Sequence, residues 1–290
     1  MPPSVPGPKD QVIPAGENLF KIALILALVA GSFYLADLAV DELETPLKWL
    51  LAASLGLLDV VLLTGIGVLA HDGVHRVLFR SPFWNDFWGG LVSALTLLPF
   101  QANRQFHLWH HSHAHQLGLD PEEKFHRYPL PVAFAAGATI AVVLQYGVLL
   151  NNLRQGRIWR AVQDILFIGL AAAIYFVLLP ALGISVLATV VPLLLAFPLV
   201  VGFRAITDHY GLPPVQRENE QPSGRVVLVP RWLEWLWSHV NYHEVHHRYP
   251  YLSHRYLPQA FAATREREPY VVVRGYWRAF RDLSGRSYYA

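Results

Sequence analysis

The chain has 290 residues, of which 53% are hydrophobic and only 15% are charged, and it contains no cysteine. Ordinary globular domains carry about 25% charged residues, so this composition indicates a membrane protein. The absence of cysteine excludes disulfides, thiolate metal ligands and cysteine nucleophiles. The formal net charge of +2 gives no electrostatic support to nucleic-acid binding, and no nucleic-acid partner is predicted.

Four apolar stretches are long enough to cross a bilayer, which takes roughly 20 mainly apolar residues. They predict an all-α integral membrane protein with four transmembrane helices in two hairpins, within a single domain of residues 1–290. The first 18 residues are polar and do not resemble a signal peptide, so the first helix would remain as an anchor. The four stretches are residues 20–40, 48–70, 165–182 and 184–203, the last two joined at Gly183.

Residues 71–164 and 204–290 are predicted to form interfacial helices and a histidine-rich cap on the cytoplasmic side. The loop after the second stretch is rich in arginine, whereas the turn between the first two is acidic, and basic loops favour the cytoplasm. Leu130–Leu150 is long enough to cross but is predicted to lie in or dip into the cytoplasmic leaflet, since crossing would separate the histidine groups. Arg231–His247 is predicted to form one helix, with tryptophans suited to an interface.

Three groups of histidines lie beside the apolar stretches, in HxxxH and HxxHH spacings, and His209 lies just beyond the fourth stretch. On a helix, residues three and four apart share a face, so each group would point its imidazoles in one direction. Imidazole suits zinc, copper, iron and nickel, and one zinc takes about four protein ligands. Nine imidazoles therefore fit two metals with open positions. The predicted ligands are His71, His75, His107, His110, His111, His209, His243, His246 and His247.

Several neighbours of these histidines are candidates for orienting them. Asp72, Asp208 and Glu244 could accept imidazole N–H groups, and Asn241 precedes the third group. A carboxyl near the middle of a span is costly, so Asp59 is a candidate for lining a substrate channel. A solvated or purely structural role is the alternative for each. Two further histidines continue the i, i+4 rows of predicted ligands, His115 after His107 and His111, and His239 before His243 and His247.

These motifs resemble those of the membrane fatty acid desaturase superfamily, non-haem di-iron enzymes that include acyl desaturases, fatty acyl hydroxylases and carotenoid hydroxylases and ketolases. The resemblance runs from about Leu69 to Pro258. His71-Asp-Gly-Val-His75 with Asn85-Asp86 is similar to HDxxH and ND, the Arg104–His111 segment to RxxHxxHH, and the Asn241–Pro250 segment to NYHxxHHxxP. His209 corresponds to an extra ligand. Some relatives have an asparagine at the position of Ala205, and that contact is not carried over.

The resemblance implies two iron ions, O2 as co-substrate, a lipid or acyl substrate, and an external electron donor such as a ferredoxin or a cytochrome b5. The predicted activity is the introduction of a double bond into a fatty acyl chain. Hydroxylation or ketolation of a lipid or carotenoid on the same site is the alternative, because Asp120-Pro-Glu-Glu resembles the carotenoid-modifying relatives. Arg154, Arg157, Arg160 and the C-terminal arginines are candidates for docking an acidic donor.

Three other classes fit parts of the sequence. His243-Glu244-x-x-His247 matches the zinc metalloprotease motif, with Glu244 as general base, but it leaves the first two histidine groups without a role. Glu123-x-x-His126 and Glu244-x-x-His247 match the pairs of carboxylate-bridged di-iron bundles, which are soluble. A metal transporter would need more intramembrane polar groups than Asp59.

Overall fold

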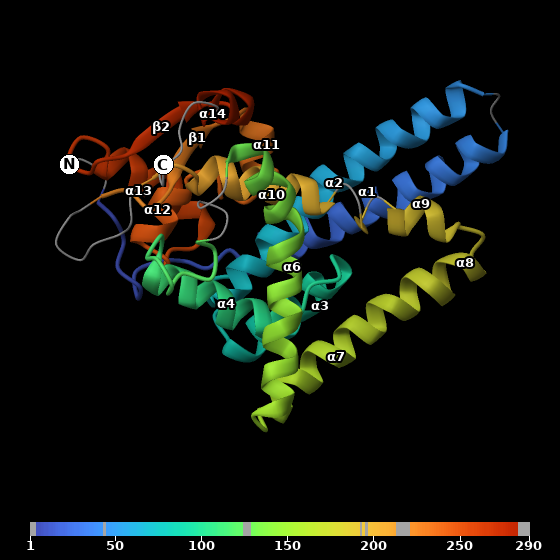
Figure 1. Cartoon of the computed structure of the whole chain (residues 1–290), viewed down its shortest axis with the longest axis horizontal. Coiled ribbons are helices and arrows are strands. Elements are labelled where there is room, and N and C mark those ends of the chain that lie inside the picture. Colours follow the sequence, from blue (N-terminus) through green and yellow to red (C-terminus); the bar gives the residue numbers. More distant parts are fainter. Residues whose placement is uncertain are drawn as a thin grey trace.

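The computed structural model describes residues 4–42, 45–123, 129–191, 193–194, 197–212 and 221–283. Most of this part is helical, as predicted. A bundle of long helices extends from one end of the molecule, and a cap of short helices and strands forms the other (Figure 1). Helices α1 (Ala15–Glu42) and α2 (Leu47–Val74) run antiparallel as a long hairpin.

Three helical segments in the described residues are long and apolar enough to cross a membrane, namely Ala15–Glu42, Leu47–Val74 and Ile158–Ala181. The third joins α7 (Ile158–Ala173), a π-helical turn and α8 (Leu179–Ala181). Only 17% of the most apolar 18-residue stretch of this segment is buried inside the protein, so its surface suits contact with lipid. The chain therefore has the hydrophobic helices of a membrane protein.

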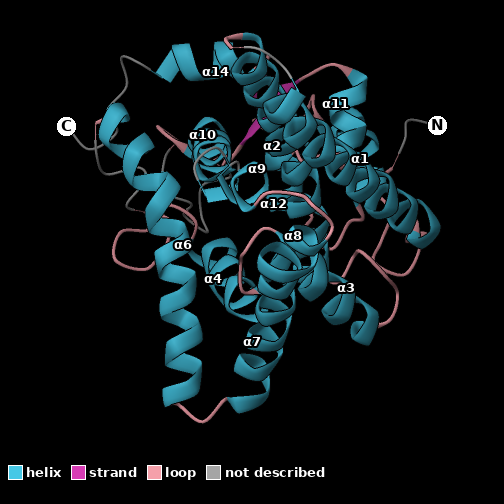
Figure 2. Cartoon of the chain, turned by 90° about the vertical axis from the view of Figure 1, so that its right-hand side faces the viewer, coloured by secondary structure: helices cyan, strands magenta, loops and turns pink. Residues whose placement is uncertain are grey.

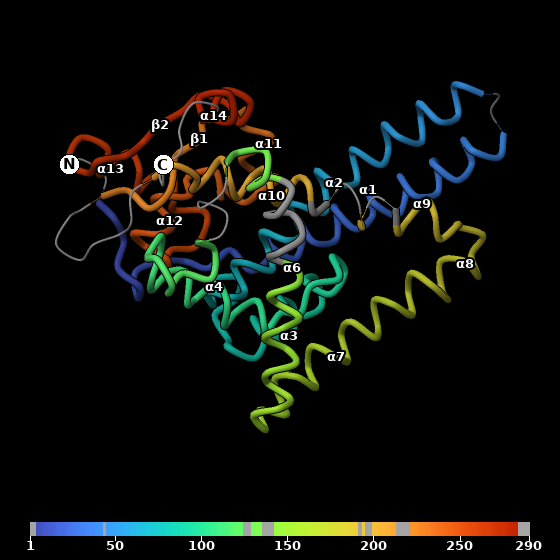
Figure 3. The backbone as a smooth tube through the Cα atoms, viewed as in Figure 1, coloured from blue at the N-terminus to red at the C-terminus, as the bar shows by residue number. Residues whose placement is uncertain are grey.

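The predicted fourth span is described as two shorter helices, α9 (Val186–Val191) and α10 (Phe197–His209), and residues 192, 195 and 196 lie outside the described part. A fourth crossing therefore stays a prediction. Helix α6 (Leu130–Arg154) runs steeply across the direction of α7 (Figure 3). The remaining helices are α3 (Pro82–Leu95), α4 (Phe100–His113), α11 (Arg231–Leu236), α12 (His243–Arg248), α13 (Leu257–Thr264) and α14 (Tyr276–Leu283).

Two details of the cap differ from the sequence-based expectation. The cap contains a parallel pair of strands, β1 (Arg225–Leu228) and β2 (Val271–Arg274), in which Arg225 pairs with Val271, so the fold is not purely α-helical. Both strands are rich in valine, which favours a pleated conformation. The predicted helix Arg231–His247 is wrong as well. It is interrupted between α11 and α12, where Ser238 and His239 adopt positive φ angles of 45° and 52°.

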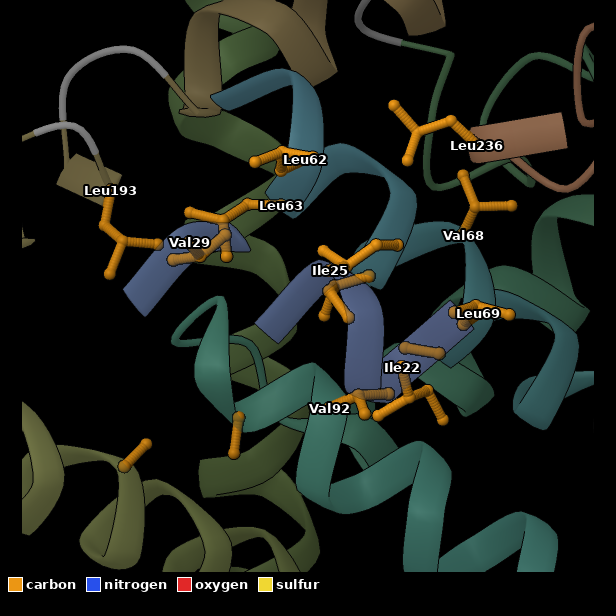
Figure 4. Close-up of a cluster of buried hydrophobic side chains, with 14 of the residues drawn as sticks. Ile22, Ile25, Val29, Leu62, Leu63, Val68, Leu69, Val92, Leu193 and Leu236 are labelled. Carbon is orange, nitrogen blue, oxygen red and sulfur yellow. The ribbon is translucent and has the colours of Figure 1, made fainter. Parts of the chain in front are cut away.

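The main hydrophobic core joins the helical hairpin to the cap. Ile25 of α1, Leu63 of α2, Val92 of α3 and Leu236 of α11 contribute to it (Figure 4). Gly65 permits the close approach of α2 to the cap, because a Cβ atom there would lie 2.8 Å from the carbonyl oxygen of Leu236. The cap is therefore packed directly on the membrane hairpin.

Replacing Gly65 by alanine should weaken this contact. The added methyl group meets backbone that cannot rotate away, so we expect the free energy of unfolding to fall by about 1–3 kcal/mol. The control is Gly31→Ala on α1, where a Cβ atom meets nothing within 4 Å and helix propensity favours alanine. Thermal denaturation in detergent measures both variants. Equal stability of Gly65→Ala and the parent protein would contradict the packing described.

Candidate metal centre

The nine histidines predicted as ligands come together where α4, α10 and α12 meet the cap end of α2 (Figure 1). His71 and His75 lie at the end of α2, and His209 is the last residue of α10. The second group lies on α4 and the third on α12. Segments separated by more than a hundred residues thus contribute imidazoles to one buried cluster.

The cluster divides into two adjacent groups. The candidate ligand atoms of His71, His75, His107, His111 and His246 all lie within 4.8 Å of one another, and so do those of His110, His209 and His247. His243 adjoins the second group, since its Nε2 atom lies 2.7 Å from His209 Nε2 and 3.1 Å from His247 Nε2. The rings of His111 and His247 stack with their centroids 4.2 Å apart. The two groups therefore lie side by side.

The chemistry of this donor set fits metal ions. Burial and the neighbouring imidazoles lower the pKa of His107, His111, His246 and His247 well below the ordinary value, which favours the neutral form that binds metal. Buried polar atoms almost always have a hydrogen-bond partner. Within the described residues, Nε2 of His71, His75 and His110 has none, as expected for nitrogens that face a metal.

Asp120 orients one of the central imidazoles. Its Oδ1 atom lies 2.9 Å from His110 Nδ1, and its carboxylate also accepts the backbone N–H groups of His115 and Glu122. Although burial opposes it, the Glu122 and Asp120 carboxylates raise the pKa of His110 to about 9. A carboxylate on Nδ1 leaves Nε2 for a metal and increases ligand basicity. The sequence alone did not indicate that Asp120 orients His110, although Asp120 follows the second histidine group closely.

Ser223 and His115 hold His209. His209 Nδ1 lies 2.8 Å from the carbonyl oxygen of Ser223 and 3.2 Å from His115 Nε2. His115 thus contacts a predicted ligand, but not through the helical row that was expected. Helix α4 ends at His113, and His115 has a positive φ of 62°. The Ser223 contact is made by backbone, which leaves no side-chain signal in the sequence.

Glu244 supports this arrangement from one layer further out. Its carboxylate accepts the N–H groups of Ser223 and Gly224, at 2.8 and 2.6 Å, and pairs with Arg248 at 2.7 Å. A Cβ atom on Gly224 would lie 3.2 Å from the backbone nitrogen of Glu244, so only glycine fits easily. Glu244 therefore fixes the loop that contacts His209. One of its oxygens faces that loop and the other faces Arg248, which disfavours a role as the general base of a zinc protease.

Other candidates lie apart from the imidazoles. Asp72 Oδ1 is 3.9 Å from His71 Nδ1, too far for a hydrogen bond. Asp208 pairs with Arg204 at 3.0 Å, and Asn241 donates to the Val227 carbonyl, which ties the third group to β1. Asp59 is buried in α2 but does not line the cavity beside the cluster.

The expected row through His239 is wrong, because α12 begins only at His243. His239 instead faces His254, with 3.4 Å between their Nδ1 atoms, and His254 Nε2 lies 2.9 Å from Asn18 Oδ1. Burial lowers the pKa of His239 to about 4. This pair joins the cap to α1 and not to the metal centre. His126 of the Glu123-x-x-His126 motif lies outside the described residues.

Asn85 and Asp86 connect the first two histidine groups. Asn85 Oδ1 accepts the N–H groups of Leu78 and Phe79, which shapes the turn after His75. Asp86 pairs with Arg104 of α4 at 2.7 Å. The ND motif therefore supports the geometry of the cluster and does not contact the imidazoles.

The comparison with known proteins agrees with this site. A fatty acid desaturase family model matches residues 44–278. The chain therefore belongs to the fatty acid desaturase family, a family of membrane oxidoreductases of lipid metabolism. A stretch of 95 residues, 33% of this chain, is 30% identical to a delta(12)-acyl-lipid-desaturase of Punica granatum, and it covers 24% of that protein's length.

Removing the Asp120 carboxylate should loosen metal binding without removing a ligand. We expect Asp120→Ala to lower metal affinity by about 10–100-fold, the usual effect of losing an outer partner of a metal-bound histidine. The measurement is metal content by mass spectrometry after dialysis against graded chelator. The control is Asp282→Ala, an exposed carboxylate on α14. Unchanged metal retention in Asp120→Ala would show that this contact does not support the site.

Proposed function

We propose that this protein is a membrane di-iron oxidoreductase that uses O2 to introduce a double bond into a fatty acyl chain. The observation that carries the proposal is the convergence of nine buried or partly buried imidazoles into two adjacent groups, in a chain of the fatty acid desaturase family. His71, His75, His107, His111 and His246 would hold one iron, and His110, His209, His243 and His247 the other. Iron bound there would supply the O2 chemistry needed to attack an unactivated C–H bond.

The chain's own residues arrange that chemistry. Asp120 and the Ser223 carbonyl fix the ring orientation of His110 and His209, which leaves their Nε2 atoms toward the centre of the cluster. Val68 and Val201 line the cavity that adjoins the cluster, and each lies one helical turn before a polar residue of the lining, His71 or Arg204. An apolar chain would therefore approach the cluster along these valines, from the membrane side. Excluding water there protects the reaction from side pathways.

A single ligand substitution tests this proposal. We expect His110→Ala to abolish turnover and to reduce bound iron, while the protein still inserts into membranes. His113→Ala is the matched control on the same helix, because His113 is only partly buried and its Nδ1 contacts the Trp109 carbonyl instead of the cluster.

Lipid mass spectrometry after expression in a host with both long acyl chains and carotenoids identifies the product. Loss of two hydrogens from an acyl chain supports desaturation, and gain of an oxygen shows the hydroxylase or ketolase alternative. Full activity of His110→Ala would contradict the site.

We further propose four crossings in two hairpins, with the cap and the α6–α7 connection on the cytoplasmic side. The steep angle between α6 and α7 supports an α6 that does not cross (Figure 3). The parent chain has no cysteine, so single cysteines can be labelled selectively. Gln155→Cys and Arg278→Cys should react with an impermeant thiol reagent from the cytoplasmic side, and Thr45→Cys from the opposite side. Labelling of Gln155→Cys on the same side as Thr45→Cys would contradict this topology.

The electron donor is proposed to be an acidic protein such as a ferredoxin or a cytochrome b5. Arg154, Arg157 and Arg160 are exposed, and Arg157 donates to Gln105 of α4, two residues before His107. A basic surface thus lies beside a helix that carries predicted ligands.

Reversing these charges should slow electron delivery. We expect Arg157→Glu with Arg160→Glu to raise the KM for the donor several-fold at low salt, because charged rims mainly control association. The control is Arg231→Glu, an exposed arginine at the start of α11. A KM that is independent of salt and of these substitutions would place the donor elsewhere.

A further inference from the structure

The cavity beside the histidine cluster has two kinds of wall. It has a volume of about 160 Å³ and lies between α2, α4, α6 and α10, which pack around one another (Figure 2). Val68, Leu98, Phe106 and Val201 form an apolar part, which suits a hydrocarbon chain. The imidazoles of His71, His107, His209 and His243 form another part of the lining.

Polar side chains other than the imidazoles also line this cavity. Gln145 of α6 is only 7% exposed, and its Oε1 atom accepts no hydrogen bond from any described residue. Buried Asp208 of α10 pairs with partly buried Arg204 at 3.0 Å. Arg204 also lies 3.4 Å from His243 Nδ1, while its Nε atom has no hydrogen-bond partner in the described chain. Three polar side chains from two helices therefore surround the space that a substrate would occupy.

A pure hydrocarbon segment is a poor match for these groups. Burying it against Gln145 Oε1 and Arg204 Nε would remove these two atoms from water without giving them a partner, which costs free energy. Ligand sites typically combine an apolar lining with a few placed polar groups that fix orientation. Gln145 cannot be explained as a holder of the imidazoles, because it makes no hydrogen bond to any of them. The arrangement therefore calls for a ligand with its own polar atom.

We propose that the substrate carries a neutral oxygen group, a hydroxyl or a carbonyl, close to the reacting carbon, and that Gln145 and the Arg204–Asp208 pair bind it. This inference rests on the proposed function, which places the substrate beside the metals. A hydroxyl can donate to Gln145 Oε1 while accepting from Arg204, and a carbonyl can accept from the guanidinium or the Gln145 amide. A carboxylate is disfavoured, because Asp208 already neutralises Arg204 and Glu122 adds a further acid to the lining.

Equilibrium binding to the full-length protein in lipid nanodiscs tests the proposal. One arm uses methyl octadecanoate and a series of its isomers with a keto group at successive chain positions. The other arm uses a trimethylcyclohexene ring compound with and without a ring ketone. Comparison of the two arms shows whether the oxygen group belongs to an acyl substrate or to a terpenoid substrate. Competition against tritiated unsubstituted ester gives relative affinities, both with iron and after its removal by chelator.

We expect one or two adjacent keto isomers, or the ring ketone, to bind about tenfold more tightly than the matching probe without the added ketone, the effect of one or two well-placed hydrogen bonds. Gln145→Leu should abolish that preference, with Gln145→Met as a second variant if the first does not fold. Gln155→Leu, at the exposed end of the same helix, should retain it.

Equal affinity of the parent protein for the probes with and without the added ketone would overturn the proposal. Gln145 would then bind water and not the substrate. A preference that persists in Gln145→Leu would overturn it too. The measurement needs no turnover, so it is separable from the proposed function. If the purified protein never binds iron but still prefers one keto isomer, the result would contradict the di-iron proposal and support the binding of the oxygen group by Gln145 and the Arg204–Asp208 pair.

Discussion

The structure depends on one constraint, which is that nine imidazoles from distant segments of the chain must share one small, largely buried volume. Their nitrogens approach within 2.7–3.2 Å of one another, as between His243 and His209 or between His246 and His111. Burial and the neighbouring imidazoles lower the pKa of His107, His111, His246 and His247, whereas the Glu122 and Asp120 carboxylates raise the pKa of His110 against the effect of burial. Metal ions satisfy such a set of imidazoles, and two adjacent metals suit its division into five and four. Side chains arranged this way have little value for packing alone.

The rest of the cap can be understood as support for that cluster. Asp120 and the Ser223 carbonyl act on the outer nitrogens of His110 and His209, and Glu244 in turn fixes the Ser223 loop. Asn85 and Asp86 shape the turn between the first two histidine groups. The membrane hairpin supplies the rigid base, because Gly65 lets the cap pack directly on α2. Ligand orientation is therefore set by contacts that extend at least two layers outward.

Much of this could be predicted from the sequence, for identifiable physical reasons. Hydrophobic length reveals membrane helices, and histidines three and four residues apart share a helix face whatever the surrounding fold. Contacts that depend on the ends of helices could not be read this way. His115 and His239 were placed on helical rows, yet α4 ends at His113 and α12 begins only at His243. The contact to the Ser223 carbonyl involves backbone, and the strands of the cap are only four residues each.

X-ray absorption spectroscopy on the purified protein, combined with metal analysis, tests most directly whether each chain binds two irons through its histidines. We expect two irons per chain, each surrounded by nitrogen and oxygen atoms without sulfur, and a second iron as a near neighbour. A single metal per chain would contradict the assignment of the nine histidines to a two-metal centre, and zinc in place of iron would contradict the di-iron proposal.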